Sequence, residues 1–266
     1  MIRSARAPTA SAPAARPGVT PPVVSIVLPT YNEHERIAEC IDAVMFVMTA
    51  NGIDGEVIVV DDNSPDGTAS IAESLTTPYP VRVIRRRKKL GLGSAVRAGF
   101  AAAAGTVLGV MDADLSHPPN LLPRLLHALE SGADFAVGSR YVAGGGTRDW
   151  PIGRWLLSRL ACLTARPLTP VRDATSGVFL IRRDVLRGVP MSTRGFKIGL
   201  ELLVRSKARV VVEVPYMFVG RSAGRSKLTV GEVFGYLYQL AELAHWRWHR
   251  RKVGVGSIGR FQEPGS

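Results

Sequence analysis

Two aspartates separated by one residue, Asp112 and Asp114, end an apolar segment at residues 107–111 that is typical of a buried strand. Two prolines then stop the strand and favour a helix over residues 120–130. A buried strand rarely ends in unpaired carboxylates, because a desolvated charge requires a partner. Mg2+ or Mn2+ is a suitable partner, since both prefer oxygen ligands and leave positions for water and phosphate oxygens. The alternative interpretation is a solvated loop that contains two acids.

Polar residues also follow two earlier apolar segments, residues 23–29 and 56–60, which are predicted to be buried strands. The polar residues are Tyr31, Asn32 and Glu33 after the first segment, and Asp61, Asp62 and Asn63 after the second. Strands that alternate with helices predict a doubly wound, mostly parallel α/β sheet. Ligands of such sheets bind outside the carboxyl ends of the strands. We therefore expect the three polar clusters to share one nucleotide-type crevice.

Other nucleotide motifs are absent from the chain. Gly91 and Gly93 lack the third glycine of the dinucleotide fingerprint and do not follow the first strand. No P-loop pattern occurs either. The sequence thus excludes hydride transfer by a Rossmann dinucleotide enzyme and P-loop hydrolysis.

The second half of the chain carries cations rather than carboxylates at the corresponding positions. Arg140 follows a strand predicted over residues 134–138, and an amphipathic helix is expected over residues 150–164. Arg154 and Ser158 are four residues apart in that helix and share one face. A guanidinium and a hydroxyl on one face can hold a phosphate. The alternative is a solvated basic helix face.

Composition limits the class of partner. The chain of 266 residues has 34 Lys and Arg against 22 Asp and Glu, a formal charge of +12. This excess predicts an anionic partner: a nucleic acid, a membrane surface or a phosphorylated substrate. No zinc-finger spacing or aromatic-rich basic strand pair supports nucleic acid. The two cysteines, without metal-binding spacing, suggest a reduced, cytosolic protein.

The chain divides into four predicted parts. Residues 1–22 form a disordered basic leader, 23–227 a single α/β domain, 228–252 an amphipathic helix and 253–266 a flexible tail. Tryptophans and basic residues near the end of that helix fit a helix lying in a membrane interface. The alternative is a helix packed on the core or on a second subunit. No run of about 18 apolar residues predicts a transmembrane helix.

Together, the motifs resemble those of the dolichol-phosphate mannosyltransferases and polyprenol monophosphomannose synthases, within inverting glycosyltransferase family 2. The resemblance rests on residues 29–33, 60–68, 111–119, 138–141 and 175–177. It covers about residues 24–227 and implies the GT-A fold for the main domain.

The resemblance implies roles for individual residues. The nucleotide sugar would contact Pro29, Tyr31, Glu33, Asp61, Asp62, Asp112, Ala113, Asp114, Arg221 and Lys227. The metal, Mg2+ or Mn2+, would be bound by Asp112, Asp114 and Ser116. The acceptor phosphate would be bound by Arg140, Arg154 and Ser158. The residues expected to take part in catalysis are Asp114, Arg140, Arg221 and Lys227, the last two on a loop that closes over the diphosphate.

The activity implied by the resemblance is transfer of mannose from GDP-mannose to a polyprenyl phosphate, with inversion. The acceptor is already an anion, so no strong general base is needed. Transfer from UDP-glucose or another nucleotide sugar remains open, as does a non-catalytic module that binds nucleotides or lipid phosphates. The expected location is the cytoplasmic face of a membrane. An integral-membrane anchor, or a downstream transferase that uses the lipid-linked sugar, is a further candidate partner.

Overall fold

The computed structural model describes residues 24–77, 79–192, 197–220 and 230–252. The predicted leader at residues 1–22 and tail at residues 253–266 lie outside these ranges. Arg221 and Lys227, the two cations expected on the closing loop, also lie outside the described residues.

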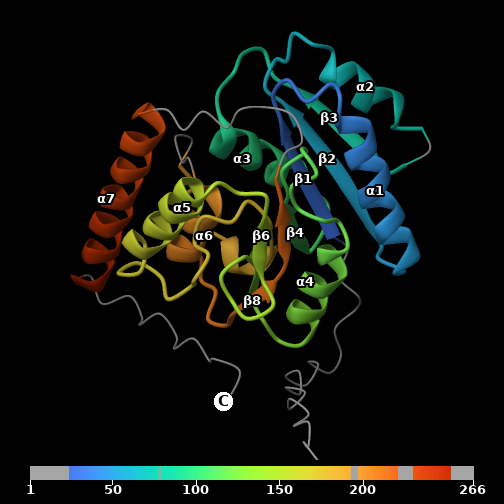
Figure 1. Cartoon of the computed structure of the whole chain (residues 1–266). Coiled ribbons are helices and arrows are strands. Elements are labelled where there is room, and N and C mark those ends of the chain that lie inside the picture. Colours follow the sequence, from blue (N-terminus) through green and yellow to red (C-terminus); the bar gives the residue numbers. More distant parts are fainter. Residues whose placement is uncertain (1–23, 78, 193–196, 221–229, 253–266) are drawn as a thin grey trace, which may run out of the picture.

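A seven-stranded sheet forms the centre of the molecule, in the order β3-β2-β1-β4-β7-β5-β8 (Figure 1). Its strands are β1 (Val24–Thr30), β2 (Gly55–Asp61), β3 (Val81–Arg85), β4 (Val107–Val110), β5 (Phe135–Ser139), β7 (Phe179–Arg182) and β8 (Val211–Pro215). All of them run in one direction except β7, which is antiparallel to both of its neighbours. The predicted mostly parallel α/β sheet is confirmed.

Helices cover both faces of this sheet. They are α1 (Ile37–Ala50), α2 (Thr68–Ser74), α3 (Leu92–Ala102), α4 (Leu121–Glu130), α5 (Ile152–Thr164), α6 (Ile198–Arg205) and α7 (Val230–Lys252), with a 3-10 helix at Arg183–Leu186. Helices α1 and α4 pack on one face, and α3 and α6 pack on the other. The sheet is therefore enclosed by helices on both sides.

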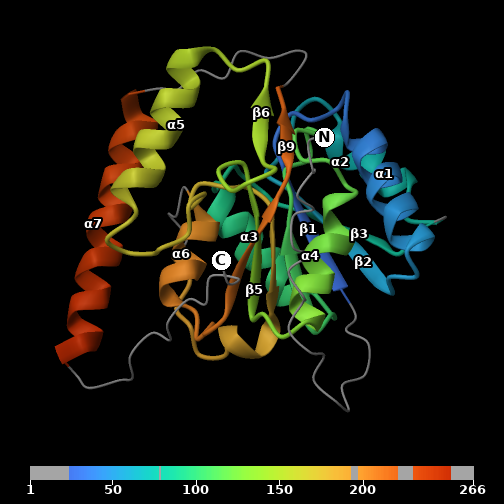
Figure 2. The ribbon, with the colours of Figure 1, turned by 60° about the horizontal axis from the view of Figure 1, so that its bottom comes forward.

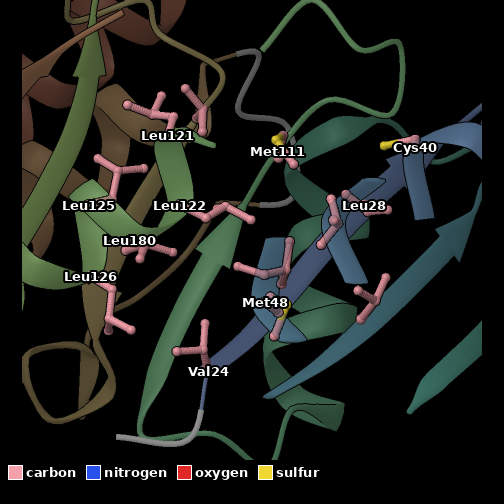
Figure 3. Close-up of a cluster of buried hydrophobic side chains, with 14 of the residues drawn as sticks. Val24, Leu28, Cys40, Met48, Met111, Leu121, Leu122, Leu125, Leu126 and Leu180 are labelled. Atoms are coloured by element: carbon pink, nitrogen blue, oxygen red, sulfur yellow. The ribbon is translucent and has the colours of Figure 1, made fainter. Parts of the chain in front are cut away.

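Strand β1, which lies between β2 and β4, is buried on both sides because its side chains alternate between two faces that are both covered by helices. Ile26 and Leu28 pack in the cluster shared with α1 and α4, part of which is drawn in Figure 3. Val27 packs on the opposite face with Phe100 of α3 and Ile198 of α6. This two-sided burial explains why the segment is continuously apolar.

Strand direction brings the polar clusters to one edge. In the parallel register, Thr30 at the end of β1 pairs with Asp61 of β2, and Val27 pairs with Val110 of β4. Strand β5 points the same way as β4, because β7 runs antiparallel to both. Arg140, the residue after β5, therefore lies at the same edge as the carboxylates.

Helices α5 and α7 lie side by side at one end of the molecule in both views (Figures 1 and 2). The hydroxyl of Tyr236 in α7 donates a hydrogen bond of 2.6 Å to the carbonyl of Ala161 in α5. Two short strands that the sequence pattern did not indicate, β6 (Gly146–Arg148) and β9 (Met217–Val219), form a separate parallel pair. None of the described helices combines the length and apolar character needed to span a bilayer.

Candidate active site

The loop after β4 carries the two predicted metal carboxylates. Leu115 adopts a left-handed conformation with a φ of 59°, which is uncommon for a residue with a side chain. Beside this turn, the backbone N–H of Ser116 donates to Oδ1 of Asp114 at 3.0 Å. Asp114 is buried, whereas the Asp112 side chain keeps 38% of its surface exposed. Between them, the side chain of Ala113 is buried in the core, so only its peptide group can face a nucleotide.

The side chains of Asp112, Asp114 and Ser116 carry oxygen atoms, the kind of ligand that a hard divalent cation prefers. The hydroxyl of Ser116 is buried and has no hydrogen-bond partner in the part of the chain that the structure describes. Within the same residues, no three His, Cys, Asp or Glu side chains gather into a closed metal site. Two carboxylates and a hydroxyl would leave other coordination positions to water and phosphate oxygens. Asp112, Asp114 and Ser116 therefore fit Mg2+ or Mn2+, and metal binding by them stays a prediction.

Two further residues surround the carboxylate of Asp112. Nε2 of His117 lies 3.1 Å from Oδ2 of Asp112, and the buried imidazole packs against the rings of Tyr216 and Phe218. Gly177 approaches from the loop before β7, where a Cβ would lie only 2.5 Å from the same oxygen. Any larger residue at this position would displace Asp112. The glycine that closes the motif at residues 175–177 thus provides space for a predicted metal ligand.

An aromatic ring and a lysine form the surface beyond the end of β1. Tyr31 is 39% exposed, and the ammonium of Lys89 lies 3.5 Å from the centre of its ring, within the range of a cation–π contact. Lys89 belongs to the basic run after β3, which the sequence analysis did not assign to the site. Pro29 and Glu33 are half-buried at the same strand end. Contact of Pro29, Tyr31 and Glu33 with a nucleotide stays a prediction.

Asp61 and Asp62 form most of their possible hydrogen bonds with other residues of the protein. Asp61 accepts hydrogen bonds from the hydroxyl of Thr30 at 3.0 Å and from the hydroxyl and backbone N–H of Ser64 at 2.6 and 2.9 Å. Asp62 accepts two backbone N–H groups of the loop after β3 and forms a 2.7 Å ion pair with Arg86. A carboxylate has about four acceptor positions. Both residues therefore shape the loops around the site, and a direct nucleotide contact stays a prediction.

On the other side of the edge, a bidentate ion pair holds Arg140. Its Nε and Nη2 donate to Asp173 at 2.7 and 2.6 Å, and Nη2 also donates to the hydroxyl of Thr175 at 3.0 Å. Burial lowers the pKa of Arg140, but the hydrogen bonds and charge of Asp173 outweigh burial and raise that pKa above its ordinary value. The side chain is therefore a permanent cation. Its Nη1 group makes no hydrogen bond to any described residue and can serve an anionic ligand.

The ring of Trp150 brings the two predicted phosphate arginines together. The guanidinium carbons of Arg140 and Arg154 lie 5.2 and 4.3 Å from its centroid. Ser158 interacts with Tyr141, whose pKa is raised by burial while Ser158 and Arg140 act to lower it. Arg140 and Arg154 thus share the ring of Trp150, and Arg140 and Ser158 both interact with Tyr141. Their binding of an acceptor stays a prediction.

Sequence reasoning overlooked two lysines of this edge, Lys89 and Lys197. The charge of Lys197, directly before α6, interacts with those of Asp112 and Arg140. Helix starts carry a partial positive charge and favour acids. The position of Lys197, a cation directly before an apolar helix, was therefore a signal in the sequence.

Comparison with known proteins agrees with this architecture. Residues 25–189 match the family model described as glycosyl transferase family 2. The chain is 44% identical over 239 residues to the dolichol-phosphate mannosyltransferase of Pyrococcus furiosus, covering 88% of this chain and 67% of that protein. It is 38% identical over 229 residues to the polyprenol monophosphomannose synthase of Mycolicibacterium smegmatis, covering 82% and 85% respectively.

A solved structure shares the fold. The glucosyl-3-phosphoglycerate synthase of Mycobacterium tuberculosis, crystallised with Mn2+, UDP and glucosyl-3-phosphoglycerate, matches with a TM-score of 0.62. The sequence identity is 24%, and the match covers 87% of this chain and 85% of that one. This likeness supports the GT-A architecture alone.

Proposed function

The chain belongs to glycosyl transferase family 2, and we propose that it transfers mannose from GDP-mannose to a polyprenyl phosphate with inversion. One observation carries the proposal: a single sheet edge presents the carboxylates Asp112 and Asp114 together with the guanidiniums Arg140 and Arg154. The names of the relatives, which are mannosyltransferases acting on dolichol or polyprenol phosphates, support the choice of sugar and acceptor.

The acceptor phosphate needs orientation and charge compensation, because it is already an anion at neutral pH. Arg140 and Arg154 would supply charge-assisted hydrogen bonds, and Ser158 a further donor. One phosphate oxygen would attack the anomeric carbon from the face opposite the diphosphate. As the new carbon–oxygen bond forms, the bond from that carbon to the diphosphate breaks and GDP leaves with the electron pair. The configuration at the anomeric carbon inverts from α to β.

The departing diphosphate accumulates negative charge, which must be stabilised in the transition state. A divalent cation bound by Asp112, Asp114 and Ser116 would act there as a Lewis acid. Arg221 and Lys227 would add positive charge when their loop closes over the diphosphate. His117 has no role as a base in this scheme, since its buried ring faces Asp112.

A membrane surface would present the acceptor. The large exposed apolar residues of two adjacent helices are Ile152, Trp155, Leu156, Leu157, Leu160 and Leu163 on α5, and Val233, Phe234, Leu237, Tyr238 and Trp248 on α7. We call this set of residues the α5–α7 surface; exposed apolar residues gathered on adjacent elements are typical of interaction sites. Arg154 stands on α5 itself, so a lipid phosphate at the interface would lie close to the site. The excess positive charge favours an anionic membrane, for which we propose the cytoplasmic face.

Other functions fit the structure less well. A non-catalytic module would have no need for a carboxylate pair beside a phosphate site. Nucleic-acid binding calls for an exposed basic strip, whereas Arg140 is buried against Asp173. Transfer from UDP-glucose uses the same geometry and is the alternative that an experiment must separate.

A panel of radiolabelled donors tests the proposal. The full chain is incubated with polyprenyl phosphate, Mg2+ or Mn2+, and GDP-mannose, UDP-glucose or UDP-galactose in turn. We expect label in the organic phase with GDP-mannose, and loss of that label on addition of a chelator. Label from UDP-glucose alone would favour the alternative donor, and no label from any donor would favour a binding module.

A further inference from the structure

Lys197 stands where local structure does not favour a cation. It directly precedes α6, whose first residues are mostly apolar and whose start carries a partial positive charge. The residue keeps some exposed surface, yet its ammonium group is desolvated enough that burial lowers its pKa. A desolvated cation requires compensation from elsewhere in the fold or from a ligand.

Packing brings the first turn of α6 against the catalytic centre. Gly199 lies against the carbonyl of Ser176, where a Cβ would be 3.2 Å from the oxygen. Gly177, which follows Ser176 in the chain, lies against the carboxylate of Asp112. The charges that act on Lys197, in decreasing order, are those of Asp112, Arg140 and Asp173. Lys197 is therefore within electrostatic reach of both the predicted metal site and the predicted phosphate site.

The backbone of Lys197 is held by a residue of α7. Oε1 of Gln239 accepts a hydrogen bond from the N–H of Lys197 at 2.9 Å, and Nε2 of Gln239 donates to its carbonyl at 3.1 Å. Gln239 is only 5% exposed. Fixing both peptide groups of Lys197 restrains the direction of its side chain. Its ammonium, in contrast, forms no hydrogen bond or ion pair with any described residue.

We propose that Lys197 binds phosphoryl oxygens of a substrate in the active site, and that Gln239 is the positioning residue that directs it there. Helix α7 then contributes to the catalytic centre as well as to the α5–α7 surface. The identity of the phosphoryl groups rests on the proposed function, in which a diphosphate occupies the donor side and a monophosphate the acceptor side. Both groups can satisfy a buried ammonium.

Calorimetric titration of the full chain, without metal or sugar donor, tests the role of Lys197. The probes are inorganic pyrophosphate and farnesyl phosphate. We expect Lys197→Met to raise the Kd for one of them at least tenfold and Lys197→Arg to recover most of the loss; the affected probe identifies the donor or the acceptor side. The matched control Lys207→Met removes an exposed lysine just beyond α6 and should change neither Kd more than twofold. A Lys197→Met protein with both values unchanged would overturn the proposal.

A second pair of variants tests the role of Gln239. Gln239→Met keeps the volume and removes both hydrogen bonds to Lys197, so the Kd of the same probe should rise at least threefold. Tyr236→Phe removes the other α7 hydrogen bond described above, to Ala161, and should leave that Kd within twofold. Equal weakening in both variants would indicate general loosening of α7 and would refute the positioning role.

These titrations contain no sugar donor, so their outcome is independent of the donor panel. A chain that transfers no sugar, yet loses phosphate binding on Lys197→Met, would overturn the proposed function and leave this inference standing. Conversely, a chain that transfers mannose but binds both probes equally well after Lys197→Met would overturn this inference and leave the proposed function standing.

Discussion

The sheet edge has two parts of opposite charge. The proposed donor side carries Asp61, Asp62, Asp112 and Asp114, and the proposed acceptor side carries Arg140 and Arg154. On the donor side, two carboxylates accept backbone N–H groups from residues close in sequence: Asp114 from Ser116, and Asp61 from Ser64. On the acceptor side, Arg140 is held by Asp173, 33 positions further along the chain. The first side gathers carboxylates that attract a cation, and the second gathers guanidiniums that attract an anion. A transfer between two phosphorylated substrates needs both.

The elements that carry the two sides also differ in exposure. Asp61, Asp62 and Asp114 are buried in the turns that end core strands. On the acceptor side, α5 buries only Cys162 and exposes a row of leucines on the helix that carries Arg154. The donor-side carboxylates thus lie mostly within the folded chain, whereas the helix that carries Arg154 opens towards an external apolar surface. We infer that acceptor recognition depends on that surface and donor recognition does not.

The largest effect is expected from the donor side. Asp114→Asn keeps the shape and an acceptor for Ser116 but removes a charge from the metal donor set, so kcat should fall about 1000-fold. The thermal unfolding temperature should stay within a few degrees of wild type. Asp54→Asn, an exposed aspartate at the opposite edge, is the matched control and should keep at least half of the activity. Comparable activity in the two variants would contradict the metal assignment.

An intermediate effect is expected from the acceptor side. Arg154→Ala removes a cation from the proposed phosphate site, and loss of a charge-assisted hydrogen bond of about 2 kcal/mol corresponds to roughly a 30-fold rise in KM for polyprenyl phosphate. The KM for the donor should change less than threefold. Arg124→Ala removes an exposed arginine of α4, away from the proposed phosphate site, and should affect the KM for polyprenyl phosphate far less. An equal rise in KM for the donor and for polyprenyl phosphate would contradict the assignment of Arg154 to the acceptor side alone.

The smallest effect concerns the α5–α7 surface. Leu160 is 55% exposed, so Leu160→Ser should lose about 1 kcal/mol of apolar burial at a membrane and weaken vesicle binding about fivefold. Flotation with anionic phospholipid vesicles measures this change. Phe46→Ser alters a residue of α1 that is 73% exposed and should leave flotation unchanged. Helix α1 lies at the opposite end of the molecule from α5 and α7 (Figure 1). Equal losses in both variants would remove the α5–α7 surface as the docking site.

Much of the donor side was predictable because its signals are local. An apolar run such as residues 24–30 predicts a strand, and the polar residues that follow it must lie at the strand's carboxyl end. The pair Asp112 and Asp114 draws its interpretation from its position after a buried strand, since two acids one residue apart also occur in solvated loops. The internal hydrogen bonds of Asp61 and Asp62 were less visible, since the N–H groups that Asp62 accepts belong to a loop almost 30 residues away.

The sequence by itself determined most of the strands and helices and the order of the polar clusters, because periodicity and turn residues act over a few neighbouring positions. Only the tertiary structure decided that β7 enters the sheet between β4 and β5, that Asp173 meets Arg140, and that Gln239 meets Lys197. Periodicity likewise shows that α5 has an apolar face, but whether that face meets the core or the outside depends on the packing of distant elements. Such contacts join segments far apart in the chain, and no local pattern encodes which segments meet.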